Sequence, residues 1–312
     1  MPSALSAPHF HSEEAAYAYV ESRIWPEGPV CPHCGGMERI SKMQGKSTRI
    51  GAYKCYQCRK PFTVKIGTIF EASHVPMNVW LQAMYLVAGS KKGISSNQLH
   101  RTLGVTLKTA WFMSHRIREA MRSGDFTPFG SDGGVVEADE TFIGFEPHVL
   151  SGEFDAGKRG FHGKMKVLAL VDRTTGRSKA YVVDKVAVDF IMPILRENIA
   201  REARLATDDA GVYRRAIKHF AAHGVVRHSR GQYGLGDIHT NTVEGYFSIF
   251  KRGMRGIYQW RGKKHLHRYL AEFDFRYSNR EANGINDAAR ADILLAGVVG
   301  RRLTYQKSCG RA

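Results

Sequence analysis

Two stretches of the sequence, VVEADETFIG (135–144) and KVLALVDRTTGRSKAYVV (166–183), decide the fold of this chain. Both are rich in valine and other residues that favour β-strands, and the second is divided at Thr175-Gly176, a pair typical of a hairpin turn. The sequence therefore predicts three consecutive strands, of which the last two form a hairpin.

Helices and strands alternate in the region that follows. The predicted strands are ARLATD (203–208) and GVVRHS (224–229), and the predicted helices are residues 188–202, 210–223, 241–253 and 263–279. This order of elements predicts a mixed α/β domain, which we place at residues 128–285.

Three acidic residues lie on these predicted elements. Asp139 is on the first strand, Asp208 ends the fourth, and Glu244 is near the start of a later helix. Acids in this order match a ribonuclease-H-like fold, in which two divalent cations sit between acids of the sheet and of a following helix. Such cations suit phosphoryl transfer, because one activates a water or a 3′-hydroxyl and the other stabilises the leaving oxygen. The set predicts a catalytic site that binds Mg²⁺ or Mn²⁺, although any single acid would more often be an ordinary surface residue.

Helical geometry adds to the case around Glu244. With 3.6 residues per turn, one face of the helix 241–253 is polar and carries Asn241, Glu244, Ser248 and Lys251. Another face is apolar and carries Val243, Tyr246, Phe247 and Phe250. The apolar face is expected to dock on the sheet and the polar face to line a cleft, where Lys251 would place a cation beside the acid, suited to a DNA phosphate. The alternative is an ordinary amphipathic helix.

Four of the five cysteines form two tight pairs, Cys31-Pro-His-Cys34 and Cys55-Tyr-Gln-Cys58, separated by 20 residues. Each C-x2-C pair presents two thiolates, and two pairs complete the closed tetrahedral shell of a structural zinc ion. This pattern indicates metal binding rather than disulfides, and therefore a reducing cytoplasm. The sequence predicts a zinc ribbon.

The segment SSNQLHRTLGVTLKTAWFMSHRIREAM (95–121) predicts two helices around Gly104, with serine and threonine residues suited to cap them. In a DNA-binding helix-turn-helix, the start of the second helix meets the base edges, so Lys108 and Thr109 are candidate DNA contacts. A helical hairpin formed only for packing is the alternative.

The charge of the chain is strongly positive, because 46 Lys and Arg residues outnumber 29 Asp and Glu residues by 17. Such a surplus favours a polyanionic partner, through phosphate contacts and counterion release. Candidate contacts beyond the helix-turn-helix are Lys158, Arg159, Arg252 and Arg255. No apolar run approaches the roughly 20 residues that span a bilayer, and the N-terminus does not read as a secretory signal. We therefore expect a cytoplasmic, nucleoid-associated protein that binds no membrane.

At these residues the chain resembles the insertion-sequence transposases that have an N-terminal zinc ribbon and a DDE-type catalytic domain, some of which have Asn in place of the last Glu. The matching stretches are WPEGPVCPHCGG (25–36), YKCYQCRKPFTVKIGTIFEAS (53–73), VEADETFIG (136–144), TDDAGVY (207–213) and HTNTVEGYFSIFKRGMRGIY (239–258). The resemblance extends from about residue 9 to residue 280, and its last motif is specific.

The resemblance implies a ribonuclease-H-like fold, a divalent metal and transposition. The catalytic positions that it implies are Asp139, Asp208, Asn241 or Glu244, and Lys251. It favours Asp139 over Glu140 and Asp208 over Asp209. The implied partners are double-stranded DNA, as terminal inverted repeats and as target, and further copies of the chain in a synaptic complex, because two ends must be cut together.

Two other functions remain open from the sequence. A DNA-binding regulator derived from an inactive transposase would keep the zinc ribbon and the helix-turn-helix but would not need the acids, and a ribonuclease-H-like nuclease would cut DNA without joining it. The expected organisation is an N-terminal helix (1–27), a zinc ribbon (28–68), a helix-turn-helix region (69–127), a catalytic domain (128–285) and a basic C-terminal tail (286–312).

Overall fold

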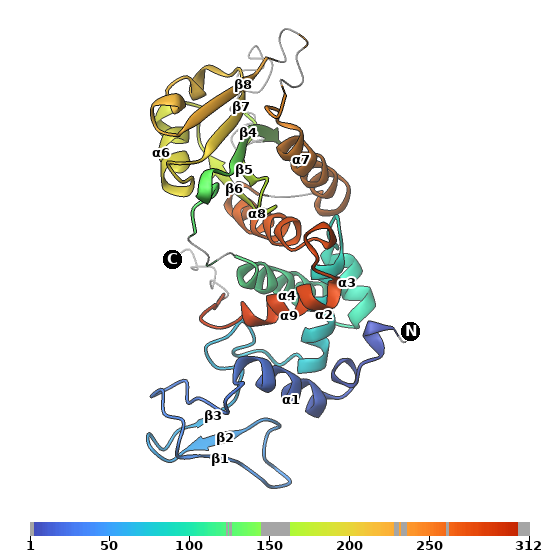
Figure 1. Ribbon diagram of the computed structural model, residues 1–312. Helices are drawn as coiled ribbons and strands as arrows, with labels where there is room; N and C mark the ends of the chain where they lie inside the picture. Colours follow the sequence, from blue (N-terminus) through green and yellow to red (C-terminus); the bar gives the residue numbers. More distant parts are fainter. Residues whose placement is uncertain are drawn as a thin grey trace, which may run out of the picture. The chain divides into compact units, whose positions relative to one another are not determined.

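The computed structural model describes residues 3–122, 124, 127–144, 163–227, 231, 236–259 and 262–304, so Lys158 and Arg159 lie outside the described residues. The chain forms two compact units (Figure 1). The first comprises Met1–Ser90, Ile94–Arg122 and Asn286–Ala312, and the second comprises Lys91–Gly93 and Ser123–Ile285. Among the described residues, none of the helices has the length and apolar character needed to cross a membrane.

The first unit opens with short 3-10 helices at Ala4–Ser6 and Pro8–Phe10, followed by α1 (Glu13–Ile24). α1 begins after Ser12, whose side chain accepts a hydrogen bond from the Ala15 amide. An apolar helix, α2 (Met77–Gly89), follows the cysteine-rich region and buries one face from Met77 to Ala88.

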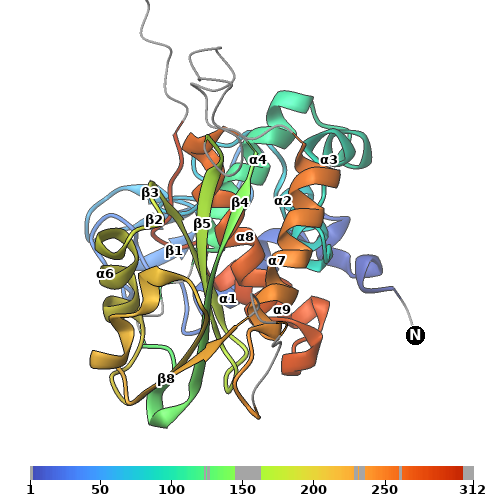
Figure 2. The same cartoon turned by 90° about the horizontal axis from the view of Figure 1, so that it is seen from above.

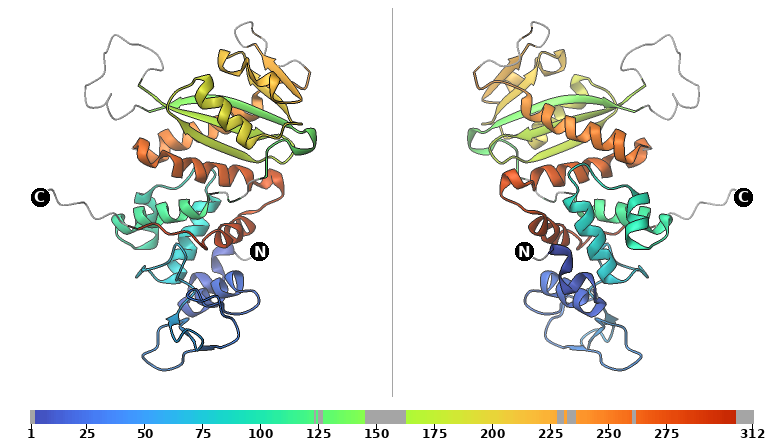
Figure 3. Two further views of the ribbon diagram at one scale, coloured as in Figure 1. Left: turned by 90° about the vertical axis from the view of Figure 1, so that its left-hand side faces the viewer. Right: turned by 90° about the vertical axis from the view of Figure 1, so that its right-hand side faces the viewer.

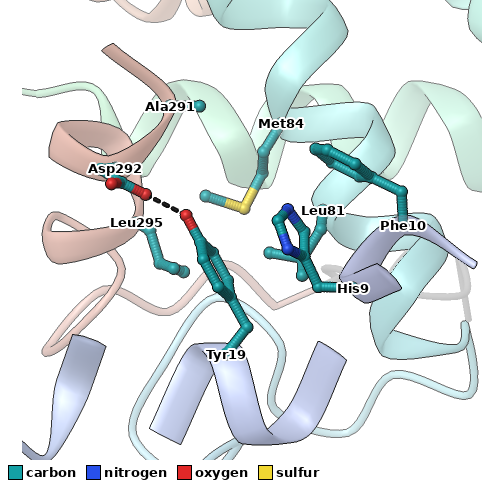
Figure 4. Close-up of a pocket in the computed structure, with 8 residues that line it drawn as sticks. All are labelled: His9, Phe10, Tyr19, Leu81, Met84, Ala291, Asp292 and Leu295. Carbon is teal, nitrogen blue, oxygen red and sulfur yellow. Dashed lines mark hydrogen bonds between the residues drawn. The ribbon is translucent and has the colours of Figure 1, made fainter. Parts of the chain in front are cut away.

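The segment expected as a basic tail contains a helix, α9 (Asp287–Ala296). It is tied to α1, because Asp292 accepts a hydrogen bond from the Tyr19 hydroxyl and forms an ion pair with Arg23 at 3.0 Å. Figure 4 shows Tyr19 and Asp292 beside a small cavity between α1, α2 and α9 that is also lined by His9, Phe10, Leu81, Met84, Ala291 and Leu295. This part of the chain therefore belongs to the folded core of the first unit.

The two helices predicted around Gly104 are α3 (Ser96–Leu103) and α4 (Leu107–Ala120). Gly104 adopts a left-handed conformation with φ 66°, which ends α3 where a residue with a side chain would be strained. Thr106 caps α4 by accepting a hydrogen bond from the Thr109 amide. The second helix of this pair therefore starts where the sequence indicated.

The cysteine-rich region of the first unit forms a small antiparallel sheet in the order β1-β2-β3. Its strands are β1 (Ile40–Lys42), β2 (Tyr53–Cys55) and β3 (Pro61–Phe62). The aromatic rings of Trp25, Tyr53 and Phe62 pack together with centroids 5.7 to 5.8 Å apart, and they form a core beside the cysteines.

The second unit is built on a five-stranded sheet in the order β6-β5-β4-β7-β8. The strands are β4 (Val135–Ile143), β5 (Met165–Asp172), β6 (Ser178–Val183), β7 (Arg204–Asp208) and β8 (Ala222–Val226). The β4-β5-β6 meander is antiparallel, whereas β7 pairs in parallel with both β4 and β8. The predicted mixed α/β, ribonuclease-H-like sheet is confirmed.

Helices cover both faces of this sheet. α6 (Val188–Asn198) packs on one face, and α7 (Asn241–Gly253) lies on the opposite face (Figure 2). α8 (Lys263–Ser278) lies on the same face as α7, as Figure 3 shows. A π-helical segment, Met254–Tyr258, continues α7, and short 3-10 helices occur at Ser131–Gly133 and Glu281–Asn283.

The helix predicted at residues 210–223 is wrong. The chain instead forms two 3-10 turns, Gly211–Tyr213 and Ala216–Lys218, and β8 already begins at Ala222. The apolar spacing that suggested a helix reflects the burial of Tyr213, Ala216 and Phe220 in the core beneath α6. Pairing of β8 with β7 takes the last residues of the predicted helix.

Candidate functional site

The four paired cysteines of the first unit converge on one point. The Sγ atoms of Cys31 and Cys58 lie 3.6 Å apart, those of Cys34 and Cys55 lie 3.7 Å apart, and all four lie within 4.8 Å of one another. Tetrahedral coordination with Zn–S bonds near 2.3 Å separates the sulfurs by about 3.8 Å. The cluster therefore fits a structural zinc ion, as the spacing of the cysteines predicted.

Local backbone geometry produces this convergence. After the first pair, the Gly35 amide donates to the Cys31 carbonyl at 2.9 Å, and Gly35 takes a positive φ of 72°. After the second pair, Arg59 takes a similar φ of 61° and the Cys55 amide donates to the Lys60 carbonyl. Each pair thus forms a tight turn that points two thiolates the same way. The ribbon is anchored to α1 by the Tyr53 hydroxyl, which donates to Glu21 at 2.8 Å.

Three carboxylates gather in the second unit where β4 and β7 run side by side. Glu137 on β4 pairs in parallel with Ala206 on β7, so residues two positions later on each strand, Asp139 and Asp208, come to the same level. Carboxylate oxygens of Asp139, Glu140 and Asp208 all lie within 4.8 Å of one another. Such a set of hard oxygen donors fits a divalent cation such as Mg²⁺ or Mn²⁺.

The electrostatics of this cluster oppose ionisation when no cation is bound. Burial raises the pKa of Asp139 to about 7, and the carboxylates of Asp208, Glu140 and Glu244 add to the rise. Burial also raises the pKa of Glu140 to about 7, with a further contribution from Asp208, while the adjacent Tyr213 hydroxyl acts in the opposite direction. A bound cation would relieve this repulsion, which is a second physical reason for the site to bind one.

The helix face predicted around Glu244 has the expected polarity. The apolar side chains Val243, Tyr246, Phe247 and Phe250 are buried against the sheet, while Asn241, Glu244 and Ser248 are exposed and Lys251 is half-buried. Glu244 accepts a hydrogen bond from the Thr240 hydroxyl at 2.8 Å. It is not part of the three-carboxylate group, although its charge contributes to the raised pKa of Asp139. Its role as a metal ligand, and that of Asn241 as its alternative, remain predictions.

The candidate DNA contacts among the described residues are distributed over several elements. Lys108 is exposed in the first turn of α4, and the Thr109 hydroxyl is held by Thr106 at 2.8 Å. Arg252 is exposed on α7 but folds back onto its own helix, where it donates to the Ser248 hydroxyl at 2.9 Å, and Arg255 is exposed in the π-helical segment. Their contacts with DNA stay predictions.

Three residues close to the acids were missed by the sequence reasoning. Glu140 joins the carboxylate group, although the family resemblance favoured its neighbour. Tyr213 is almost fully buried beside Glu140, and burial together with that carboxylate raises its pKa well above the usual range. Glu137 is fully buried on β4. The available signal for Glu137 was its position two residues before Asp139, which in a strand means the same face.

Comparison with known proteins agrees with both halves of this description. Residues 132–278 match the ISXO2-like transposase domain, and residues 11–61 match the transposase zinc-ribbon domain. The chain is 28% identical over 280 residues to an uncharacterized protein in the transposable element ISH50 of Halobacterium salinarum, and the match covers 86% of this chain and 91% of that protein.

A solved structure is also similar at a low level. It is a chain of the simian T-cell lymphotropic virus intasome in complex with the PP2A regulatory subunit B56 gamma, with 11% identity and a TM-score of 0.28. The match covers 63% of this chain and 65% of that chain. The family rests instead on the two domain matches, which follow one another along a single chain. By these matches, the chain belongs to the insertion-sequence transposases that combine an N-terminal zinc ribbon with a DDE-type, ISXO2-like transposase domain.

Proposed function

We propose that this chain is an active DNA transposase, which hydrolyses a phosphodiester bond at each end of its insertion sequence and joins the freed 3′-hydroxyl to target DNA. The observation that carries the proposal is the convergence of Asp139, Glu140 and Asp208 from two neighbouring strands in a domain of the transposase family. A regulator that had lost catalysis would not need these acids to be gathered, so this alternative is not favoured.

The chemistry follows from the acids and the charge of the chain. Asp139 and Asp208 would hold divalent cations, with Glu140 and with Glu244 or Asn241 as further oxygen donors. Bound cations supply activation of the attacking oxygen and stabilisation of the leaving oxygen. The exposed face of α7 would lie along the DNA backbone, where Lys251 would steady a phosphate.

The first unit would recognise the ends of the element. The zinc ribbon and the α3-α4 pair would bind the terminal inverted repeats, with Lys108 and Thr109 near base edges. The net charge of +17 supports a large phosphate-contacting surface. We further propose that copies of the chain assemble on two ends in a synaptic complex in the cytoplasm, in association with the nucleoid, because both ends must be cut for transposition.

A strand-transfer assay on a labelled duplex with the terminal repeat tests the proposal. The wild type should release a nicked product and then a joined product in the presence of Mg²⁺ or Mn²⁺. Asp139→Asn and Asp208→Asn should lose both products while retaining DNA binding, because each removes a charge that a hard cation requires but nearly preserves shape. The matched control is Asp209→Asn, since Asp209 is exposed and outside the carboxylate group. Cleavage without joining would indicate the nuclease, and normal cleavage by either acid variant would refute the assignment.

A further inference from the structure

Glu137 is a fully buried carboxylate on β4, with an exposed fraction of 0%. Strand residues two positions apart point to the same side, so Glu137 faces α7 as Asp139 does. A buried carboxylate is tolerated only where hydrogen bonds and opposite charge replace its lost hydration. The partners of Glu137 therefore indicate what holds it there.

The first partners of Glu137 come from the first turn of α7. Its Oε2 atom accepts a hydrogen bond from the Val243 amide at 2.9 Å, and its Oε1 atom accepts one from the Thr242 hydroxyl at 2.8 Å. Amides in a first helical turn have no partner within the helix, and Thr240 at the N-cap position makes no side-chain capping bond. Glu137 thus caps α7 from the neighbouring strand, where its negative charge also complements the helix dipole.

The remaining partners secure the chain that leads into α7. Arg173, which follows β5, forms an ion pair with Glu137 through Nε. The same guanidinium donates to the carbonyl oxygens of Asp237 at 2.5 Å and His239 at 2.6 Å. His239 Nδ1 lies 3.2 Å from Glu137 Oε1. One carboxylate therefore links β4, the end of β5 and both sides of the start of α7.

We propose that Glu137 is a positioning residue, which fixes the first turn of α7, and with it Asn241 and Glu244, relative to Asp139 on β4. The inference rests on the proposed function, because it concerns the third oxygen donor of that site. A site assembled from a strand and a helix needs their spacing fixed, since a misplacement of about 1 Å can lower a rate about 100-fold. Residues that orient metal ligands typically change metal affinity or activity by about 10- to 100-fold when replaced.

The test compares Glu137→Gln with Asp274→Asn in the zinc-loaded full-length chain. Asp274 is a carboxylate of the same unit that also accepts several hydrogen bonds, from Tyr246 of α7 at 2.8 Å, from the Ala180 amide at 2.9 Å and from Ser178 at 3.2 Å. It contacts α7 at Tyr246, away from the first turn. Both variants replace a hydrogen-bonded carboxylate by an amide, so they make the same chemical change but differ in what they position.

Three quantities are measured: melting temperature, Mn²⁺ binding by electron paramagnetic resonance, and cleavage of the terminal-repeat duplex. Glu137→Gln should weaken Mn²⁺ binding and lower the cleavage rate, each by about 10-fold or more. Asp274→Asn should change neither Mn²⁺ binding nor the cleavage rate, whatever its effect on the melting temperature. Thr242→Val, which removes one contact to Glu137, should shift Mn²⁺ binding and cleavage in the same direction by less.

The outcomes separate this inference from the proposed function. If Glu137→Gln does not fold, Thr242→Val decides the question. If Glu137→Gln, or Thr242→Val in its place, shows no more loss of Mn²⁺ binding than Asp274→Asn, Glu137 is only structural and the inference is overturned. If the wild type binds Mn²⁺ but never cleaves, the proposed function fails, and the Mn²⁺ titrations still decide the positioning role.

Discussion

Replacing Asp139 by asparagine is expected to stabilise the metal-free protein while abolishing cleavage. Asp139 has a pKa of about 7 in the folded chain, against about 3.9 for an ordinary aspartate. A carboxyl whose folded pKa is raised loses stability as the pH rises from its unfolded pKa through its folded pKa. Above pH 7 the wild type must therefore hold an unfavourable charge among Asp208, Glu140 and Glu244, and asparagine removes that charge.

The size of the effect follows from the shift. A rise of about three in the pKa at 1.36 kcal/mol each gives at most about 4 kcal/mol at pH 8, and the same two pKa values give a clearly smaller difference at pH 5. For a unit of about 150 to 250 residues, 1 kcal/mol moves the melting temperature by about 2–4 °C. The Asp139→Asn variant should thus melt on the order of 10 °C higher than the wild type at pH 8, and the gap should narrow at pH 5.

Scanning calorimetry of the zinc-loaded chain, with and without Mg²⁺, measures this difference. Mg²⁺ should stabilise the wild type, by about 2.7 kcal/mol at a concentration 100 times its dissociation constant, and should stabilise the variant far less. Asp209→Asn serves as the control, because its exposed carboxylate lies outside the cluster. Equal melting temperatures of variant and wild type at pH 8 without Mg²⁺, or an undiminished Mg²⁺ effect in the variant, would refute the reasoning.

Three further predictions concern the zinc site, the DNA interface and the third ligand. Cys55→Ser, or removal of zinc by a chelator, should unfold the ribbon but leave the calorimetric transition of the second unit in place; loss of both transitions would contradict this. Affinity for a terminal-repeat duplex should fall linearly with salt on logarithmic axes, by about 0.9 per phosphate neutralised; a flat salt response excludes a phosphate-dominated interface. Glu244→Gln should impair cleavage more than Asn241→Ala, because a carboxylate brings charge to the cation. Asn241→Ala should keep the melting temperature, because Thr240 and not Asn241 occupies the N-cap position. The reverse order of activities would make Asn241 the third ligand.

Features set by neighbours in the sequence were predictable because their physics is local. The cap of α1 at Ser12, the left-handed Gly104 between α3 and α4, and the hairpin between β5 and β6 each depend on a few adjacent residues. The zinc cluster is similar, since two C-x2-C turns present their thiolates by backbone geometry, and only the closure of the two turns is long-range. The amphipathic pattern of α7 likewise identified its buried face.

The tertiary structure decided what depends on pairing between distant segments. The register of β4 with β7 brings Glu140 as well as Asp139 to Asp208, and the pairing of β8 with β7 replaces the helix expected at 210–223 by two short turns. Nothing in the sequence indicated that Glu137 would cap α7, which begins more than 100 residues later. The sequence alone thus determined most of the element types and the zinc ligands, because periodicity and spacing indicate them. It also indicated two of the acids, through their order along the predicted elements and the family resemblance. The surroundings of those acids were decided only by strand register and packing, because neither is encoded within a local window.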